Sequence, residues 1–371
     1  MGLRQEVREL RKITGILLCL IGQIAQAQNH NLNTIDRLDV MAWNVEWLGD
    51  ANNGPSNEPI QMSNTIKVIK NYNVDVIGLC EISSDQAWID LTKNLTEYSG
   101  VRSTWTQTQK TALLYKKDQF SLVYQKHVLD KYSYDFASGR LPLEVCLKTP
   151  NNDTFYFWVI HLKANTGSTS AKVEAYNRRY TAALALKTHS KGFRNGVILG
   201  DWNDDFDQSI LTGYNSPFLG FVKDTSSFVS ATLALSNQGR KSTVSYSDMI
   251  DHIVLSGDFR GRIIEDSVMV LNPGSFISSY GSSTSDHYPV FVKTKFPVKR
   301  NADIREIRDI HYYFDVDGKL VVNGKEVIGA INYDLLGRAS VFENNVYFSD
   351  LNHGLNVVYF ENKRIRLKIV K

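Results

Sequence analysis

Short apolar runs typical of β-strands alternate with segments of helical periodicity over residues 38–295, and this alternation constrains the fold most. Strands are expected over 39–47, 74–82, 112–115, 143–147, 155–162, 197–200, 250–255 and 288–294. Helices are expected over 62–72, 87–95 and 173–189, where apolar residues recur at helical spacing. Because several strands follow one another without a helix between them, the pattern favours a mixed α/β sandwich over a chain of βαβ units.

Polar residues stand at the tips of these apolar runs. A carboxylate, amide or imidazole there costs free energy to bury unless it is paired or bound to a metal. The tips carry Asn44, Glu81, His161 with Lys163, Asp201 with Asn203, Asp251 with His252, and Asp286 with His287. Each one alone is better explained as a surface residue, a cap, a turn or a structural histidine. Together they indicate a functional site, because loops converge at the end of a sheet.

The order and content of these tips resemble the endonuclease/exonuclease/phosphatase superfamily, which includes deoxyribonuclease I, over residues 38–295. The resemblance implies an α/β fold, a four-layered α/β/β/α sandwich, as the catalytic domain, which we place over residues 36–297. It also implies hydrolysis of a phosphodiester. That reaction needs charge compensation on the phosphate, an activated water and help for the leaving oxygen.

The resemblance also implies which residues bind the metal and the phosphate. Glu81 is expected to bind the metal directly, with Asn44 and Asp286 as further ligands nearby. Oxygen ligands suit Mg²⁺, with Mn²⁺ or Ca²⁺ as alternatives. Arg140 is expected to hold a substrate phosphate bidentately, with Lys163 beside it, whereas the alternative for Arg140 is a surface arginine that caps a loop.

Five further tips are expected to carry the catalytic chemistry. Asp201 and Asn203 should position the attacking water and the phosphate. His161 and His287 should flank the phosphate as proton donor, proton acceptor or charge stabiliser, and the division between them stays open. Asp251 should hydrogen-bond His287 and select its tautomer.

Two positions depart from the pattern of the resembled nucleases. Ser83 stands two residues after Glu81, where those enzymes carry Arg or Lys. Gln109 stands nearest to the position where the nuclease branch has a Glu that pairs with its first catalytic histidine, here His161. Both departures argue against duplex-DNA cleavage of the familiar kind but leave the phosphodiesterase core intact. His252 is expected to be structural.

The overall charge does not argue for nucleic acid as a partner. Lys and Arg number 42 and Asp and Glu 39, for a formal net charge of +3, so a phosphate-binding surface has to be a local patch. Candidates for lining such a groove are Arg178, Arg179, Arg240 and Lys241, although each alone is better explained as solvated surface.

The first 27 residues have the pattern of a secretory signal peptide. A basic segment from Arg4 to Lys12 is followed by a mostly apolar run over 13–24 and by Ala25-Gln26-Ala27, a small-x-small cleavage site. The apolar run is shorter than the ~20 residues that cross a bilayer, so no stable membrane insertion is expected. We therefore predict a cleaved signal over 1–27 and a secreted or cell-surface protein, exported through the periplasm and across the outer membrane.

Residues 304–371 read as a separate, small all-β domain, which follows a linker at 296–301. This tail resembles the sorting domain of the type IX secretion system in the segments 333–338 and 351–358 and in its basic, apolar end. The resemblance implies the secretion machinery as a partner. A carbohydrate-binding or structural appendage is the alternative.

Outside the leader, which contains Cys19, the chain has Cys80 and Cys146, each in an apolar run. We expect both to be buried free thiols, with a single disulfide between them as the alternative, because a large core does not need staples.

The function expected from these features is a secreted Mg²⁺-dependent phosphodiesterase, a nuclease that hydrolyses DNA, RNA or both. One alternative is a sphingomyelinase-like phospholipase C, which would need an exposed aromatic hairpin that the sequence does not identify. A third hypothesis is a surface-binding protein that kept the fold and lost catalysis. The intact set of polar tips argues against it.

Overall fold

The computed structural model describes residues 37–296, and of the later residues 312–314, 317, 319–322, 325–326, 328–333, 339–347, 351, 355–360 and 365–370. The chain divides into two compact units, Met1–Pro297 and Val298–Lys371, and each is described by itself. The predicted signal peptide, most of the predicted linker, and residues 334–338 and 352–354 of the sorting-domain resemblance lie outside the described residues. No described helix combines the length and apolar character of a membrane span.

Two six-stranded sheets form the centre of the first unit. The first sheet has the order β11 (Met269–Val270), β12 (Val290–Lys295), β1 (Arg37–Leu48), β2 (Val76–Ile82), β4 (Lys110–Lys116) and β3 (Tyr98–Arg102). The second has the order β5 (Ser121–His127), β6 (Leu143–Lys148), β7 (Thr154–His161), β8 (Gly196–Asp201), β10 (Asp251–Ser256) and β9 (Phe228–Ser230). Each sheet contains one parallel pair at its centre, β1 with β2 and β7 with β8.

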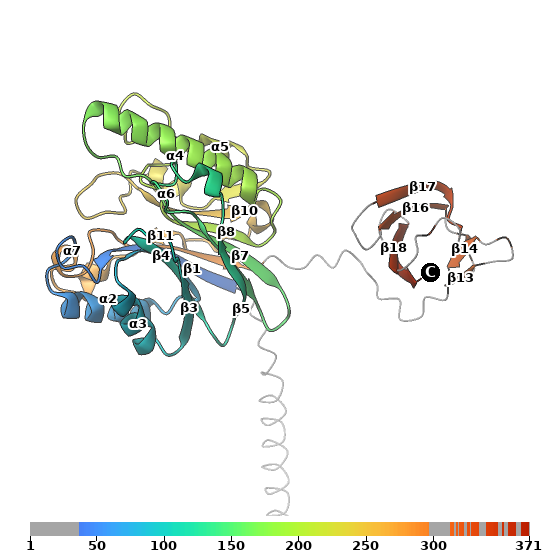
Figure 1. Cartoon of the computed structure of the whole chain (residues 1–371), viewed down its shortest axis with the longest axis horizontal. Helices are drawn as coiled ribbons and strands as arrows, with labels where there is room; N and C mark the ends of the chain where they lie inside the picture. The colour runs from blue at the N-terminus through green and yellow to red at the C-terminus, as the bar shows by residue number, and fades with distance from the viewer. Residues whose placement is uncertain are drawn as a thin grey trace, which may run out of the picture. The chain divides into compact units, whose positions relative to one another are not determined.

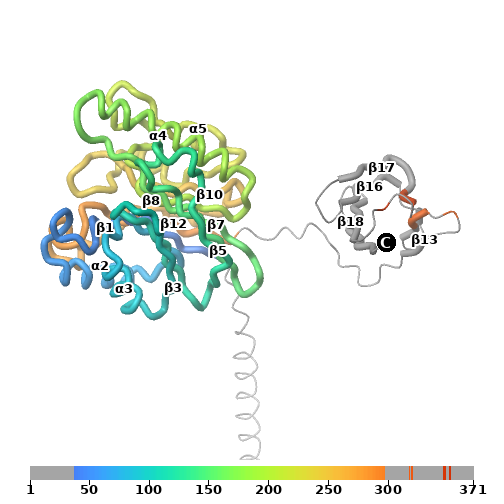
Figure 2. Tube along the Cα trace, viewed as in Figure 1, coloured from blue at the N-terminus to red at the C-terminus, as the bar shows by residue number. Residues whose placement is uncertain are grey.

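Helices cover the outer face of each sheet (Figure 1). The first sheet packs on α2 (Glu58–Tyr72) and α3 (Asp85–Asn94), with α7 (Tyr280–Ser283) nearby. The second packs on α4 (Thr169–Ser190) and α5 (Leu219–Lys223), while α6 (Leu233–Asn237) follows β9. Three 3₁₀ turns complete the unit: η1 (Asp130–Tyr132), η2 (Gly257–Phe259) and η3 (Pro273–Ser275). The predicted α/β/β/α sandwich is confirmed, and the trace in Figure 2 shows the same layers.

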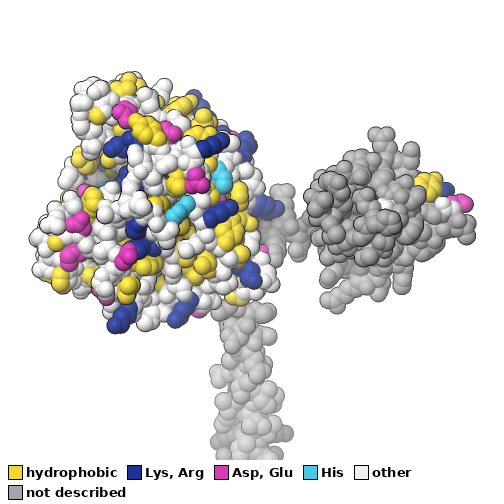
Figure 3. Space-filling view, in the orientation of Figure 1, with side chains coloured by type: hydrophobic (Ala, Val, Ile, Leu, Met, Phe, Trp, Pro, Cys, Tyr) yellow, Lys and Arg dark blue, Asp and Glu magenta, His cyan; other side chains and the backbone are white. Residues whose placement is uncertain are grey.

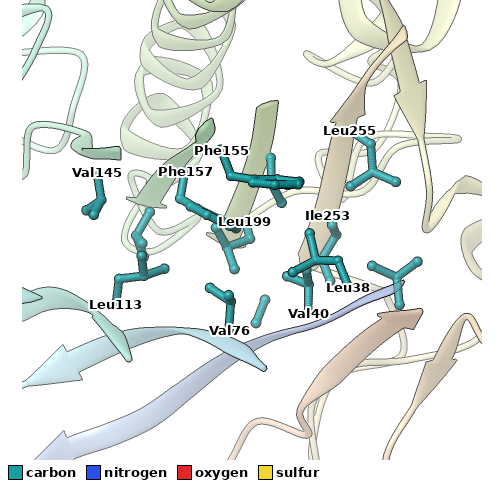
Figure 4. Close-up of a cluster of buried hydrophobic side chains, with 14 of the residues drawn as sticks. Leu38, Val40, Val76, Leu113, Val145, Phe155, Phe157, Leu199, Ile253 and Leu255 are labelled. Carbon is teal, nitrogen blue, oxygen red and sulfur yellow. The ribbon is translucent and has the colours of Figure 1, made fainter. Parts of the chain in front are cut away.

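The main core lies between the two sheets, where apolar side chains from both inner faces meet (Figure 4). Gly78 on β2 permits the close approach, because a Cβ atom there would lie 2.7 Å from Leu199 of the opposite sheet. Cys80 and Cys146 are buried free thiols, so the prediction for both is confirmed. Burial of these apolar surfaces stabilises the sandwich without a disulfide.

All eight predicted strands and all three predicted helices are present, with shifted ends. The helix expected to start at residue 62 begins at Glu58, because Asn57 caps it and accepts a hydrogen bond from the Ile60 amide. Four strands were missed: β3, β5, β9 and β11. Strand β5 lies at the edge of its sheet and is mostly exposed, so it has no apolar pattern to detect.

The described parts of the second unit are mainly strands. One three-stranded sheet contains β13 (Tyr312–Phe314), β14 (Leu320–Val322) and β15 (Lys325–Glu326). A four-stranded sheet contains β17 (Ala339–Asn345), β16 (Ile328–Tyr333), β18 (Leu355–Phe360) and β19 (Ile365–Val370). The assignment of this unit as a secretion sorting domain stays a prediction.

Candidate active site

Strand pairing brings the predicted polar tips to one edge of the sandwich. In the first sheet, Asn44 lies opposite Cys80, so Asn44 and Glu81 end neighbouring parallel strands. In the second sheet, Asp201 lies opposite both His161 and Asp251. Carboxyl ends of adjacent parallel strands meet at the same edge, which explains why residues far apart in the sequence share one site.

The carboxamide of Asn44 connects the two sheets. Its nitrogen donates hydrogen bonds to Glu81 Oε1 at 3.1 Å and to Asp201 Oδ2 at 3.0 Å. Its oxygen accepts from the Glu46 amide at 3.0 Å, so in this arrangement the Asn44 oxygen faces away from Glu81. Asn44 therefore positions the two carboxylates, and direct metal ligation by Asn44 would require its amide to turn.

Buried acidic groups concentrate negative charge at this edge. Glu81 and Asp201 are 8% and 2% exposed. Burial, reinforced by the charge of Asp251, raises the pKa of Asp201 to about 7. Burial also raises the pKa of Glu81. Ligand atoms of Glu81, His161 and Asp201 lie within 4.8 Å of one another. This crowding of oxygen donors fits a hard divalent cation, which would offset the charge.

Glu46 is a further acidic group of the site that the sequence analysis did not select. Its Oε2 accepts a hydrogen bond from the Asp286 amide at 2.9 Å. Burial, with the charges of Asp286 and Glu81 adding to it, raises the pKa of Glu46 to about 7. Asp286 itself has a side chain that is 47% exposed. The available signal was the period-two spacing of Asn44 and Glu46 in one strand.

His287 is the charged histidine of the site. Its Nδ1 lies 2.7 Å from Asp251 Oδ2, the hydrogen bond that the resemblance implied. Burial opposes the charged form, but the charges of Asp251, Asp201 and Asp286 outweigh it and raise the pKa of His287 well above its usual value. The Ser242 hydroxyl accepts from the Asp251 amide at 3.0 Å and thereby holds the start of β10.

The pKa of His161 is shifted in the opposite direction from that of His287. Burial, with the charge of Arg140 adding to it, lowers the pKa of His161 well below its usual value. Its Nε2 lies 3.4 Å from Asp201 Oδ2 and 3.7 Å from Glu81 Oε1. The Nε2 of His287 lies 4.0 Å from the same Asp201 oxygen. Two imidazoles whose pKa values are shifted in opposite directions thus lie close to the same carboxylate oxygen.

Asn203 forms a tight turn after β8. Its amide donates to Asp201 Oδ1 at 2.9 Å, and its side-chain nitrogen donates to the Leu162 carbonyl at 3.1 Å. Gly200 before them has φ +139°, and a Cβ atom there would lie 2.1 Å from the Ile160 carbonyl. The Gly-Asp-x-Asn sequence therefore sets the direction of Asp201 through the backbone.

Left-handed backbone conformations cluster at the strand tips. Glu46, Trp47, Glu81 and Asn203 have φ values of 49°, 49°, 67° and 55°. Such conformations cost non-glycine residues of order 1–3 kcal/mol each and persist where the surrounding structure holds them. The site is therefore positioned by backbone as well as by side-chain contacts.

Arg140 supplies a buried cation beside these acids. The residue is 6% exposed, which excludes the alternative of a surface arginine. It donates to Gln109 Oε1 at 2.5 Å and to the Leu162 carbonyl at 2.8 Å, and its Nε has no partner among the described residues. Lys163 is half-buried, and burial lowers its pKa. Arg140 therefore supplies a positive charge next to the acidic groups, which would help to compensate the charge of a phosphate.

A family model described as Endonuclease/Exonuclease/phosphatase family matches residues 41–287, which include every strand tip of this site. The chain belongs to the endonuclease/exonuclease/phosphatase family. Membership indicates phosphoester hydrolysis as its chemistry. No curated protein sequence matches the chain.

Solved structures of family proteins share the fold of the first unit. The human nocturnin catalytic domain is 18% identical, with 70% of this chain and 94% of that chain covered and a TM-score of 0.50. A D. rerio TDP2 structure, complexed with a single-strand DNA product, is 15% identical, with coverage of 69% and 98% and a TM-score of 0.51. The endonuclease/exonuclease/phosphatase from Bacteroides vulgatus is 15% identical, with coverage of 70% and 98% and a TM-score of 0.50.

Gln109 distinguishes this endonuclease/exonuclease/phosphatase protein from the nucleases it resembles. Its side-chain nitrogen donates to Glu81 Oε1 at 3.0 Å, while its oxygen accepts from Arg140. No hydrogen bond joins it to His161, whose buried Nδ1 has no partner among the described residues. Gln109 therefore links the acidic and basic sides of the site.

Two arginines expected to line the groove serve the fold instead. Arg179 is fully buried and forms a two-point ion pair with Asp204 at 2.8 and 3.0 Å. Arg178 is 7% exposed and donates to Ser138 at 2.9 Å. Both point inward from α4, which residue type alone does not reveal. His252 is structural, as expected: it is fully buried and stacks on a phenylalanine ring.

Proposed function

We propose that this chain is a secreted, metal-dependent phosphodiesterase whose substrate is nucleic acid: DNA, RNA or both. The observation that carries the proposal is the convergence of His161 and His287 on one oxygen of Asp201, at 3.4 and 4.0 Å. This arrangement offers a proton acceptor and two imidazoles close to Glu81. Those are the parts that water attack on a phosphodiester requires.

Glu81 would hold a divalent cation, and the charges of Asp286 and Glu46, which interact with Glu81, would add to the attraction. Mg²⁺ fits such carboxylate oxygens. The cation would supply charge compensation for the phosphate. Arg140 adds a positive charge close to Glu81 and Asp201, which would help to offset the charge of the phosphate.

Asp201, with a pKa near 7, is suited to accept the proton of the attacking water. The water oxygen forms a bond to phosphorus, and the bond from phosphorus to the leaving oxygen breaks. His287 carries the proton that the leaving oxygen needs, since Asp251 stabilises the imidazolium. Neutral His161 donates a hydrogen bond through Nε2 to a phosphate oxygen.

One observation supports nucleic acid as the substrate, one bears on how its phosphates would be recognised, and sequence patterns support export. The similar TDP2 structure is described as a complex with a single-strand DNA product. On the face shown in Figure 3, basic and acidic side chains are interspersed, so phosphate recognition would depend on the few cations at the site. Export rests on the signal-peptide pattern of residues 1–27 and on the sorting-domain resemblance of 304–371.

The proposal is tested with plasmid DNA, RNA and sphingomyelin as substrates, each with Mg²⁺ and with a chelator. We expect nucleic acid to be cleaved only when metal is present. His161→Ala and His287→Ala should each lower kcat at least a hundredfold, because general acid–base groups contribute about 10²–10⁴ in rate. Gel assays and phosphate-ester release measure the products.

His189→Gln is the matched control, because His189 pairs with Glu144 away from the site and glutamine keeps a donor for that carboxylate. The control should cleave like the wild type, and all variants should melt within a few degrees of it. Release of choline phosphate without cleavage of nucleic acid would instead identify a phospholipase. Inactivity toward every phosphoester with metal present would reject catalysis altogether.

A further inference from the structure

A groove lies beside the edge of the sandwich that carries the candidate active site. Its volume is about 430 Å³, and it is lined by Gly239, Arg240, Lys241, Val270, Leu271, Asn272 and Tyr288. None of these residues belongs to the metal or proton-transfer positions described above, and Arg240 and Lys241 are the two remaining candidates from the sequence analysis for lining a phosphate-binding groove. A concave surface of this size can take one nucleotide-sized group.

Two cations that are neighbours in the sequence line this groove. Arg240 and Lys241 are exposed, and neither forms an ion pair with a residue that the structure describes. The Lys241 ammonium donates only to the Val244 carbonyl, at 3.0 Å, which leaves its charge uncompensated. Two unpaired positive charges side by side favour an anionic ligand.

An aromatic ring also lines the groove. Tyr288 is half-buried and stacks on Tyr280 with ring centroids 5.5 Å apart and an interplanar angle of 10°. Buried Leu271, whose amide donates to the Pro289 carbonyl at 2.8 Å, adds an apolar lining residue. A held aromatic ring beside cations is the combination that binds single-stranded nucleic acid, with bases stacking on the ring and phosphates on the cations.

The groove adjoins the catalytic edge through the segment that precedes β12. Thr243 pairs with His287 in an isolated antiparallel bridge, and the Tyr288 amide donates to the Ser242 carbonyl at 2.7 Å. Tyr288 directly follows His287, and the side chains of successive residues in an extended chain point to opposite faces, so the groove lies on the other side of this segment from His287. A flexible polymer that passes His287 can therefore continue into the groove with a neighbouring unit.

We propose that this groove binds the nucleotide next to the scissile phosphate of a single-stranded polynucleotide, with Arg240 and Lys241 on its phosphates and Tyr288 against its base. This inference rests on the proposed function, because it extends the same substrate beyond the catalytic site. It defines the substrate class as an extended single strand.

The test is binding, measured separately from cleavage. Fluorescence anisotropy of a labelled single-stranded octamer in chelator, over a range of salt concentrations, compares the full chain with its Arg240→Ala/Lys241→Ala variant. We expect affinity to fall about tenfold and the slope of log K against log salt to flatten by about 1.4, at about 0.7 per phosphate contact of a single strand. A merely structural change would not alter the slope in this way.

The Lys93→Ala/Lys117→Ala variant is the control, because it removes the same charge from two exposed residues away from this edge. Its affinity and slope should match the wild type. Tyr288→Leu should weaken binding of the octamer but not of an abasic octamer, since only the former has bases to stack.

The proposal that the groove binds a nucleotide would be overturned by either of two results. One is an equal salt slope in the wild type and the Arg240→Ala/Lys241→Ala variant, and the other is no octamer binding by the wild type. Cleavage is read independently with bis(p-nitrophenyl) phosphate and with the octamer. Binding that follows the predicted pattern without any cleavage would support the groove and reject the proposed hydrolase. Cleavage of the octamer without the predicted binding pattern would support the proposed hydrolase and reject the groove as a binding site.

Discussion

At the scale of single residues, Gln109 makes this site different from the pattern it resembles. A carboxylate at this position would neutralise Arg140, whereas the amide accepts from Arg140 without cancelling its charge. The same amide donates to Glu81, which a carboxylate could not do. Gln109 thus keeps the cation available for a phosphate and holds the acid beside it.

Replacing Gln109 with Glu should therefore weaken substrate binding more than it slows the chemical step. We expect KM for bis(p-nitrophenyl) phosphate to rise about tenfold, equivalent to about 1.4 kcal/mol, with kcat changed less. Steady-state kinetics at saturating metal measure the split. Gln86→Glu, at an exposed position of α3, controls for the added charge. A fall in kcat alone would contradict this role.

The sequence identified most residues of the site because strand tips are readable, but it did not give side-chain directions. Arg140 and Arg179 both lie near an apolar run, yet one interacts with Glu81 and Asp201 and the other pairs with Asp204. The orientation of the Asn44 amide depends on partners from two sheets. Such partners come together only in the folded chain.

At the scale of elements, the pattern of apolar residues predicted the buried strands and missed exposed or very short ones. Strands such as β2 and β8 are buried along their whole length, so their apolar runs were clear. Strand β5 is exposed along most of its length, and β11 has two residues. A strand can be recognised from apolar periodicity only when it has a buried face and contains several residues.

Strand β10 contains a histidine whose protonation is linked to stability. His252 is fully buried, and burial lowers its pKa to about 3 from the usual 6.5. Between these values the unfolded chain binds a proton and the folded chain does not, so this contribution to stability is lost as pH falls below 6.5. Acid therefore destabilises the fold through this residue.

The His252→Gln variant lacks that titration and keeps a donor for the Asp204 carbonyl. We expect it to be less stable than the wild type at pH 7.5. The gap should narrow by about 2–3 kcal/mol between pH 7 and pH 4.5, since each pKa unit corresponds to 1.36 kcal/mol. Urea unfolding at several pH values measures this difference. A gap that stays constant with pH would contradict the linkage.

At the scale of the whole molecule, the distance between the two sheets depends on one missing side chain. Gly78→Ala would place a Cβ atom 2.7 Å from Leu199, and overpacking of this kind costs about 1–3 kcal/mol. The double variant Gly78→Ala/Leu199→Ala should be more stable than the sum of the single losses predicts, by at least about 1 kcal/mol.

Urea unfolding of the full chain and its variants provides the double-mutant cycle. Gly220→Ala is the control, because a Cβ atom there would meet only the flexible side chain of Lys187, at 3.3 Å. Additive losses for Gly78 and Leu199 would show that the sheets are free to move apart.

The sequence also divided the molecule correctly into layers, because three amphipathic helices and two sets of strands can bury their apolar faces in few ways. Residues 1–27 and the sorting function of 304–371 remain predictions from sequence. The roles predicted for these segments depend on recognition by export machinery, which reads short signals and not a packed core.

Asn44 joins Glu81 of one sheet to Asp201 of the other by its two N–H groups. A slide of one sheet over the other by a single residue, about 3.3 Å, would separate these atoms while leaving each ladder of backbone hydrogen bonds intact. The geometry of the site therefore depends on how the two sheets are packed together, not only on the integrity of each sheet.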